Sequence, residues 1–356
     1  MGANVRANAS SSRSAKTTYG FWLRIAAIAF GIAALVFAPS PAWVEHAYVN
    51  GVYPVWEHAL FALSSRLPWS LGDLLVIAGL AAIAWRLWRR DWLGALAIAG
   101  FYACWFEAGW GWNYDRAPIE TRTDYDRGRI TARAIGALRA RAIAQMNRLA
   151  PLAHAHAGES LNLEALRAAW VPVVQAGGDA WTPLTGAPKP TLADPFMAAT
   201  GTSGYINPLA LDVHLASDLL WFERPFSLAH EWSHIAGYAR EDEANFLAIV
   251  SCTRSNDPVV QYSGWLELFL YLPPQARYRK STFVPQVWQD FAAMRERDRR
   301  RINVSLATFS WHTYNAYLKS NHVASGVQNY DEVTRLYLGI ERDAAGLPKA
   351  RVGGAP

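Results

Sequence analysis

Three residues within one short segment carry the side chains of a metal hydrolase: His230, Glu231 and His234, in HEWSH. On a helix, residues four apart share a face, so both imidazoles can bind one metal ion while Glu231 points toward the same side. Catalytic zinc commonly takes two histidines and a glutamate and keeps one position for water. A carboxylate beside the first ligand can take the proton of that water. The segment predicts a zinc hydrolase with Glu231 as general base.

A second segment, EDEAN, follows closely and offers the third ligand. Gly237 suits a sharp turn at the end of the first helix, and the acidic residues suit the start of a second helix. If the chain reverses there, Glu241 returns to the metal, and Glu243 is the alternative ligand. Asn245 lies one turn further, where its side-chain oxygen could accept a hydrogen bond from a ligand histidine and fix its tautomer.

The pairing of HExxH with an ExxAN segment resembles the gluzincin class of metallopeptidases. This resemblance implies that His230, His234 and Glu241 bind zinc and that Glu231 is the base. It also implies that Asn245 supports a ligand histidine from the second shell of the metal. Aspartate is the commoner residue at that last position of the class, and a neutral amide would polarise the histidine less.

A wider likeness extends over most of the chain. WGWNYDRAP (110–118), GYINP (204–208), PFSLAHEWSHIAGYAREDEANF (225–246) and YLK (317–319) follow apolar N-terminal segments in that order. In this arrangement the chain resembles a bacterial family of membrane-anchored, predicted zinc metallopeptidases that is filed as a domain of unknown function. The resemblance implies N-terminal transmembrane helices followed by a mainly helical α+β zincin-like domain with a small sheet. It implies no substrate.

Hydropathy divides the 356 residues into a membrane anchor and one domain. Three segments are long and apolar enough to approach a bilayer core of about 30 Å, although a cleaved signal peptide is the alternative for the first. These predicted spans are residues 21–38, 71–88 and 92–110. The expected layout is a cytoplasmic tail (1–20), the anchor (21–110), a zinc metallopeptidase-like domain (111–345) and a flexible tail (346–356).

The basic residues predict how the anchor is oriented. They precede the first span and crowd the turn between the second and third, whereas the loop 39–70 has only Arg66. Both basic flanks should be cytoplasmic, so three crossings place the domain outside. We expect a multi-pass protein of the bacterial cytoplasmic membrane that contacts membrane lipids and has its catalytic domain on the extracytoplasmic side.

Net charge and cysteine content exclude other classes of protein. The net charge is +5, but Glu296 and Asp298 interrupt the basic run 295–301, which indicates a solvated helix face. We therefore expect no nucleic-acid partner. Cys104 and Cys252 are the two cysteines and fall far apart, so the sequence predicts neither a disulfide framework nor a cysteine zinc site.

The remaining elements follow from periodicity and breaker residues. Residues 127–149 and 159–176 have helical spacing, with Pro151 as a break, and 177–195 is rich in loop-forming residues. The alternation within 196–215 predicts a hairpin, whose edge from residue 204 could hold an extended substrate or serve structure alone. The apolar stretch 246–272 should be helical; it could support the metal helices from behind, but we interpret it simply as part of the core.

Two sets of polar residues remain without a definite role. A tyrosine or histidine could donate to the oxyanion of a hydrolase, and the candidates are His312, Tyr314, Tyr317, His322 and Tyr330. The residues after the third span could fix the domain to the anchor or line the cleft; they are Asn113, Tyr114 and Arg116.

The leading functional hypothesis is a membrane-anchored zinc metallopeptidase that hydrolyses peptide bonds in peptide or protein substrates through a zinc-bound water. The alternative is a catalytically silent zinc-binding membrane scaffold or sensor, which Asn245 and the unassigned oxyanion donor motivate. A transporter would need ionisable residues inside the spans, and the available ones lie near span ends: Arg24, Asp73, Arg86 and Glu107.

Overall fold

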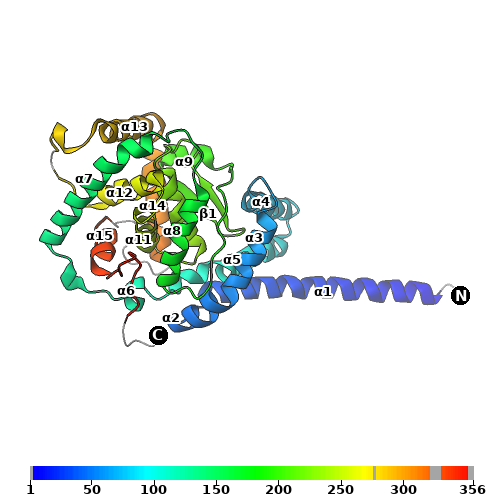
Figure 1. Ribbon diagram of the computed structural model, residues 1–356. Coiled ribbons are helices and arrows are strands. Elements are labelled where there is room, and N and C mark those ends of the chain that lie inside the picture. Colours follow the sequence, from blue (N-terminus) through cyan, green and yellow to red (C-terminus); the bar gives the residue numbers. More distant parts are fainter. Residues whose placement is uncertain (1–2, 276–277, 321–329, 352–356) are drawn as a thin grey trace.

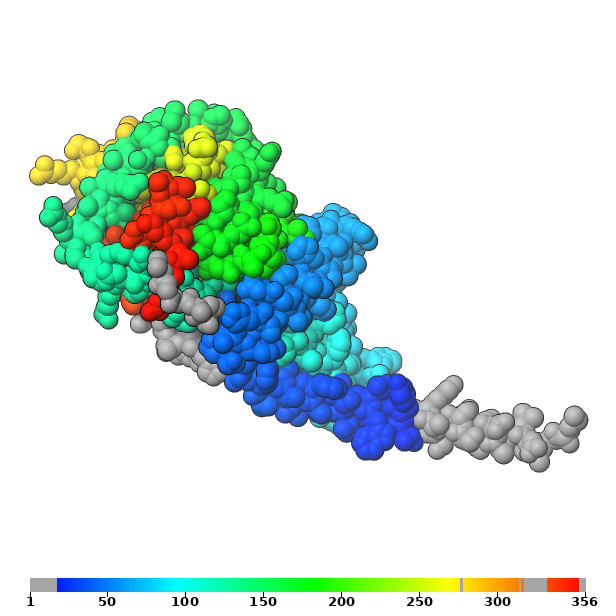
Figure 2. Space-filling view, turned by 60° about the horizontal axis from the view of Figure 1, so that its bottom comes forward, coloured from blue at the N-terminus to red at the C-terminus, as the bar shows by residue number. Residues whose placement is uncertain are grey.

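The computed structural model describes residues 3–275, 278–320 and 330–351, and it is mainly helical with one two-stranded sheet, as predicted. The N-terminal region forms α1 (Ala3–Val36), α2 (Pro41–Trp43), the π-helical η1 (Val44–Val52), α3 (Tyr53–Ser64), α4 (Leu71–Trp88) and α5 (Trp92–Gly109). Figures 1 and 2 show this region, blue to cyan, projecting as an arm from a rounded domain.

The domain consists of short connecting elements, long helices and one hairpin. It contains η2 (Gly111–Asp115), α6 (Ile119–Arg122), η3 (Arg127–Arg129), α7 (Ala132–His154), α8 (Leu163–Ala176), α9 (Asp194–Thr200), β1 (Gly204–Asn207), β2 (Asp212–Leu215), α10 (Arg224–Ile235), α11 (Glu241–Thr253), α12 (Pro258–Tyr271), η4 (Lys280–Thr282), α13 (Pro285–Arg301), α14 (Val304–Ser320) and α15 (Tyr330–Gly339).

Two helices of the arm are long and apolar enough to cross a membrane, at Thr18–Val36 and Leu71–Trp88. The third predicted span forms α5, which contains Glu107 and is not among them. The helices pack side by side: a side chain at Gly31 of α1 would collide with the backbone of Gly100 in α5, and Tyr102 of α5 donates to Leu75 O of α4 at 2.6 Å. Small residues permit such close helix packing.

The end of the arm away from the domain carries an ion-pair cluster. Arg24 of α1 and Arg86 of α4 both bind Asp91, at 2.9 and 3.0 Å, beside the turn into α5. The turn between α4 and α5 therefore lies beside α1, and Figure 1 shows α1 extending away from the domain.

Helix α11 is the centre of the domain core. Its residues from Asp242 to Cys252 are all buried, and α8, α10, α12 and α15 pack around it. The apolar stretch 246–272 is helical and forms part of the core, as predicted, but as two helices, because Asp257 caps α12 through the amides of Val259 and Val260. Burial on every side explains why this stretch shows no polar face.

The structure corrects three details of the predicted elements. Helix α7 continues through Pro151 to His154, since a proline in the last turn interrupts little of the hydrogen bonding. Residues 194–200, expected to be loop and hairpin, form α9. The predicted flexible tail is ordered at its start, because Ala350 pairs with Thr123 and Lys349 O accepts the amide of Asp124 at 2.8 Å.

Candidate metal centre

Helix α10 carries HEWSH and ends in a reversal that depends on one glycine. Gly237 has φ +85°, a left-handed conformation that favours glycine. The amides of Gly237 and Tyr238 donate to His234 O and Ser233 O at 3.0 and 3.1 Å, which is the Schellman pattern of helix termination. The chain then turns back into α11, as the sequence predicted.

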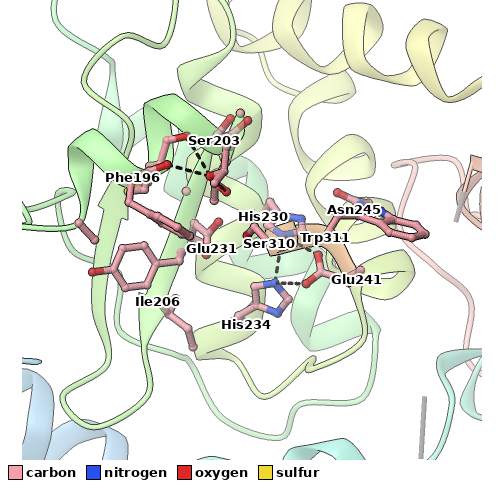
Figure 3. A pocket seen from close by; sticks show the side chains of 18 of the residues that line it. Phe196, Ser203, Ile206, His230, Glu231, His234, Glu241, Asn245, Ser310 and Trp311 are labelled. Atoms are coloured by element: carbon pink, nitrogen blue, oxygen red, sulfur yellow. Dashed lines mark hydrogen bonds and ion pairs between the residues drawn. The ribbon is translucent and has the colours of Figure 1, made fainter. Parts of the chain in front are cut away.

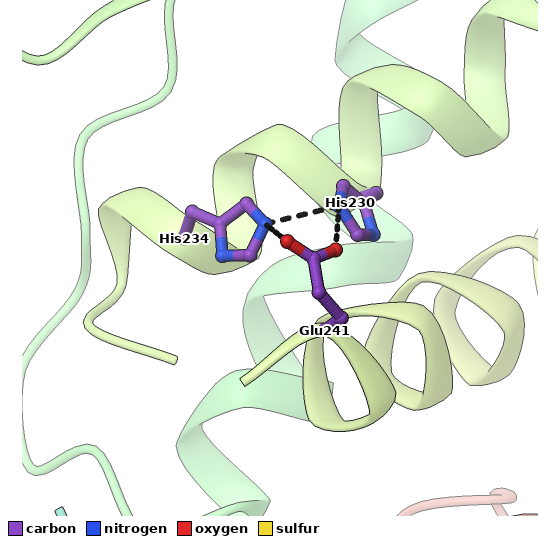
Figure 4. Close-up of side chains that lie close together, drawn as sticks. All are labelled: His230, His234 and Glu241. Carbon is purple, nitrogen blue, oxygen red and sulfur yellow. Dashed lines mark hydrogen bonds and ion pairs between the residues drawn. The ribbon is translucent and has the colours of Figure 1, made fainter. Parts of the chain in front are cut away.

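The reversal brings His230, His234 and Glu241 together (Figure 4), with one potential ligand atom from each within 4.8 Å of the others. His230 Nε2 lies 3.2 Å from Glu241 Oε2, and His234 Nε2 lies 3.7 Å from Glu241 Oε1. The two Nε2 atoms are 3.0 Å apart. The three side chains point at a common centre from two helices.

Glu243, the alternative third ligand, faces away from the histidines. Its Oε1 accepts the amide hydrogen of Ile119 at 2.9 Å and lies 3.6 Å from Arg240 Nε. Residues two apart on a helix point in nearly opposite directions, so α11 can present only one of the two glutamates to α10. The structure therefore pairs Glu241, and not Glu243, with the histidines.

The turn after α10 also sets the orientation of one imidazole. Tyr238 O lies 2.7 Å from His234 Nδ1, so Nδ1 carries the hydrogen and Nε2 presents a lone pair toward the centre. The sequence assigned such a role to Asn245. Asn245 lines the same cavity, but the described residues provide no hydrogen-bond partner for His230 Nδ1, and His234 Nδ1 is already bonded. The carbonyl of Tyr238 takes the role for His234.

Electrostatics show that the three side chains are suited to a cation. Burial disfavours charge on His234 and Glu241, yet Glu241 raises the pKa of His234 to about 9, and the two histidines hold the pKa of Glu241 well below its usual range. The cluster therefore stabilises positive charge beside the carboxylate. Two imidazole nitrogens and a carboxylate are donors that zinc accepts, so the residues fit this metal.

Glu231 lies beside this cluster and is buried against strand β1 (Figure 3). A side-chain carbon at Gly204 would lie 2.7 Å from Glu231 Oε1, so only glycine leaves room for this close approach. Within the described part of the chain, Glu231 Oε2 has no hydrogen-bond partner. Burial raises the pKa of Glu231, while both histidines oppose the shift and Glu241 adds to it.

The cluster opens into a cavity of about 1170 Å³. Strand β1 and α9 line one wall, α14 contributes Trp311 and His312, and the end of α5 closes another part. His312 is thus the predicted oxyanion candidate that the structure places at the cavity. The side chains of Tyr314, Tyr317 and Tyr330, and the whole of His322, lie outside the described residues.

The last carbonyls of α10 are bound by side chains from the N-terminal region. Tyr53 OH donates to Ile235 O at 2.6 Å, Trp110 Nε1 donates to His234 O at 3.0 Å, and Arg116 Nη1 donates to Ala236 O at 3.3 Å. A cationic group at a helix C-terminus is also electrostatically favourable. The metal helix is therefore fixed directly to the end of the arm.

The residues after the third predicted span could fix the domain to the anchor or line the cleft, and the structure shows examples of both. Arg116 is buried between Glu45 and Asp179, at 2.9 and 2.5 Å, and locks the domain to η1. Asn113 packs against Gly237. Tyr114, in contrast, lines the cavity. The sequence predicts no role for Tyr53 or the Trp110 indole in binding this helix end, because contacts between distant segments leave no local signal.

Comparison with protein families gives one match. The model of the family described as "Protein of unknown function (DUF3810)" matches residues 48–338, which include the second and third predicted spans and the metal cluster. No curated protein and no solved structure matches the chain.

Proposed function

Because the chain belongs to this family of unknown function, DUF3810, whose description names no activity, we propose its function from the site: a membrane-anchored zinc metallopeptidase. The observation that carries the proposal is the convergence of His230, His234 and Glu241 beside the buried carboxylate of Glu231 in one cavity. A cluster that only stabilised the fold would not need a neighbouring carboxylate with one oxygen that has no hydrogen-bond partner among the described residues.

In this proposal His230 Nε2, His234 Nε2 and the Glu241 carboxylate hold the metal. Bound zinc would supply a Lewis acid and lower the pKa of a coordinated water to about 7. Glu231 takes a proton from the attacking water and gives it to the nitrogen of the departing amine, so that the carboxylate is regenerated in each cycle. Burial raises the pKa of Glu231, which strengthens it as a base for the first transfer.

Strand β1 supports a peptide as the substrate. It pairs only with β2 in the described sheet, and Ala216 N donates to Ser203 O at 2.8 Å just before the paired residues. Because hydrogen-bonded and free positions alternate in an antiparallel pair, the main-chain groups of Gly204 and Ile206 point to the free edge. An extended peptide can bind that edge through its own main chain, next to Glu231.

The membrane location is the second part of the proposal. Helices α1, α4 and α5 pack together, and their charged ends gather at Asp91, away from the domain. Three crossings with the basic end in the cytoplasm would place the metal cluster on the extracytoplasmic side. Length and composition alone mark α1 and α4 as candidate membrane spans. Helix α5 packs against both of them, which supports α5 as the third span.

Purified full-length protein in detergent tests the activity. We expect about one zinc per chain, hydrolysis of an unstructured protein, loss of hydrolysis with a chelator and recovery with zinc. Glu231→Gln should keep the zinc and lose activity by roughly a hundredfold or more, because its side chain cannot take the proton. A zinc scaffold would instead show full metal binding and no hydrolysis in the wild-type protein, and this result would refute the peptidase.

A further inference from the structure

One short strand connects the proton-accepting residue with the beginning of a candidate membrane helix. At one end of β1, Gly204 lies against Glu231 Oε1. At the other end, the side chain of Asn207 fills the space where a side chain at Gly72 would be, in the first turn of α4. Three residue steps at about 3.3 Å each cover roughly 10 Å. Glu231 is therefore only this far, along the strand, from the start of α4.

The start of α4 marks the level of the membrane boundary if α4 crosses the bilayer. Its 18 residues extend about 27 Å, close to the thickness of the hydrocarbon core, so neither end can lie far from the boundary. Trp69, just before the helix, is 49% exposed, as expected for a tryptophan at the headgroup level. On the domain side, polar groups cover the start of α4, and Asp212 accepts a hydrogen bond from the amide of Gly72 at 2.9 Å.

The cavity wall next to α4 is independently suited to lipid contact. Asp73 of α4 accepts the amide of Leu192 at 2.8 Å and so fixes the segment before α9 at the same level. Leu192 is 75% exposed and Phe196 of α9 is 48% exposed. Phe196 also lines the cavity, so a single short helix separates the cavity from this apolar surface.

The end of α5 completes the boundary of the cavity on this side. Phe106, Trp110 and Tyr114 line the cavity, and they belong to the last turn of α5 and the residues that follow it. The cleft therefore lies beside the domain-side end of α5, and strand β1 connects it with the start of α4. Figure 1 shows the hairpin on the side of the domain that faces α4.

From this geometry we propose that the substrates are polypeptides anchored in the same membrane, cut a few residues from the bilayer surface. The inference rests on the proposed peptidase function and adds the substrate class. A peptide bound along the free edge of β1 reaches the level of α4 within about three to six residues of the bond beside Glu231, at roughly 3.3 Å per residue. The apolar surface of Leu192 and Phe196 contacts the lipid at that level.

Cleavage of designed peptides tests the substrate class. The full-length protein with zinc is reconstituted in phosphatidylcholine vesicles together with a peptide that has one apolar helix and a flexible tail. We expect mass spectrometry to locate cleavage within about three to six residues of the helix end, and the same tail without the helix to be cut at least about tenfold more slowly. Equal rates, or cleavage at any distance, would overturn the inference but leave the peptidase intact. Cleavage of neither peptide would contradict the peptidase itself.

A second measurement locates the surface without any need for activity. Leu192→Cys carries a fluorescent label in vesicles that contain lipids with a nitroxide quencher, and Leu152→Cys, 51% exposed on α7 away from the arm, is the matched control. Cys104→Ala provides the background, since Cys252 is buried. We expect at least twofold stronger quenching at position 192. Equal quenching at both positions would show that this surface does not touch the membrane.

Discussion

Trp110 donates its indole hydrogen to the main-chain oxygen of His234 at 3.0 Å. This bond joins the residue that ends a helix of the arm to a residue of the metal cluster. Tyr53 and Arg116 bind the next carbonyls of the same helix end, so the cluster and the arm form one connected structure. Moving α10 relative to the arm would break these bonds, and the position of the cleft relative to the arm is accordingly fixed.

The choice of the third ligand is tested by a matched pair of glutamates. Glu241→Gln should lower zinc affinity at least about tenfold, because the carboxylate charge beside both histidines is lost. Glu243→Gln should keep the affinity, since its oxygen binds the amide of Ile119 instead. Competition with a zinc-binding dye measures both variants. Loss of zinc only in Glu243→Gln would show that the other glutamate is the ligand.

Gly204→Ala tests the approach of β1 to Glu231. The new methyl group would lie 2.7 Å from Glu231 Oε1 and 2.9 Å from His214 O, so the carboxylate must shift. We expect unchanged zinc content and hydrolysis slowed by about ten- to a hundredfold, as for other small displacements of a reacting group. Gly136→Ala is the control, because no atom lies within 4 Å of the added carbon. Normal activity of Gly204→Ala would show that hydrolysis does not depend on the close approach of β1 to Glu231.

Arg116→Met tests the lock between arm and domain. The variant leaves the carboxylates of Glu45 and Asp179 buried without their main partner, which should cost about 3–5 kcal/mol of unfolding free energy. Thermal unfolding in detergent measures the loss. Arg300→Ala removes an exposed arginine that binds only the surface residue Glu296, and its unfolding midpoint should not change. A small loss of stability in Arg116→Met would mean that packing around Arg116, and not its ion pairs, holds the arm to the domain.

Glu57 should make stability depend on pH. The residue is fully buried, and burial raises its pKa to about 8, although the amide of Leu184 opposes the shift. A raised carboxyl pKa means that the folded state binds the proton more tightly than the unfolded state. Stability is therefore highest at acidic pH and falls as the pH rises from about 4.5 toward 8.

Glu57→Gln keeps the acceptor for Leu184 N, at 2.8 Å in the wild type, but cannot ionise. We expect the variant to unfold at the same temperature as the wild type near pH 5 and at a higher temperature near pH 9. The exposed Glu164→Gln should follow the wild-type curve at both values. If the unfolding temperatures of Glu57→Gln and the wild type changed equally with pH, the raised pKa of buried Glu57 would be contradicted.

The sequence by itself determined the features that depend on neighbours within a few residues. His230, Glu231 and His234 occupy one turn because of helical periodicity, and Gly237 ends the helix because it adopts a positive φ. Alternation places the hairpin within 196–215, and the structure narrows it to 204–215. The long helices and the apolar helix α4 follow from the same local rules.

Only the tertiary structure decided which distant groups meet these residues. Glu241 and Glu243 are both acidic residues at one helix start, and the angle between α10 and α11 selects between them. The turn after α10 places Tyr238 O, and not the side chain of Asn245, against Nδ1 of His234. Contacts across the fold depend on how whole helices pack, and no spacing within a segment records that geometry.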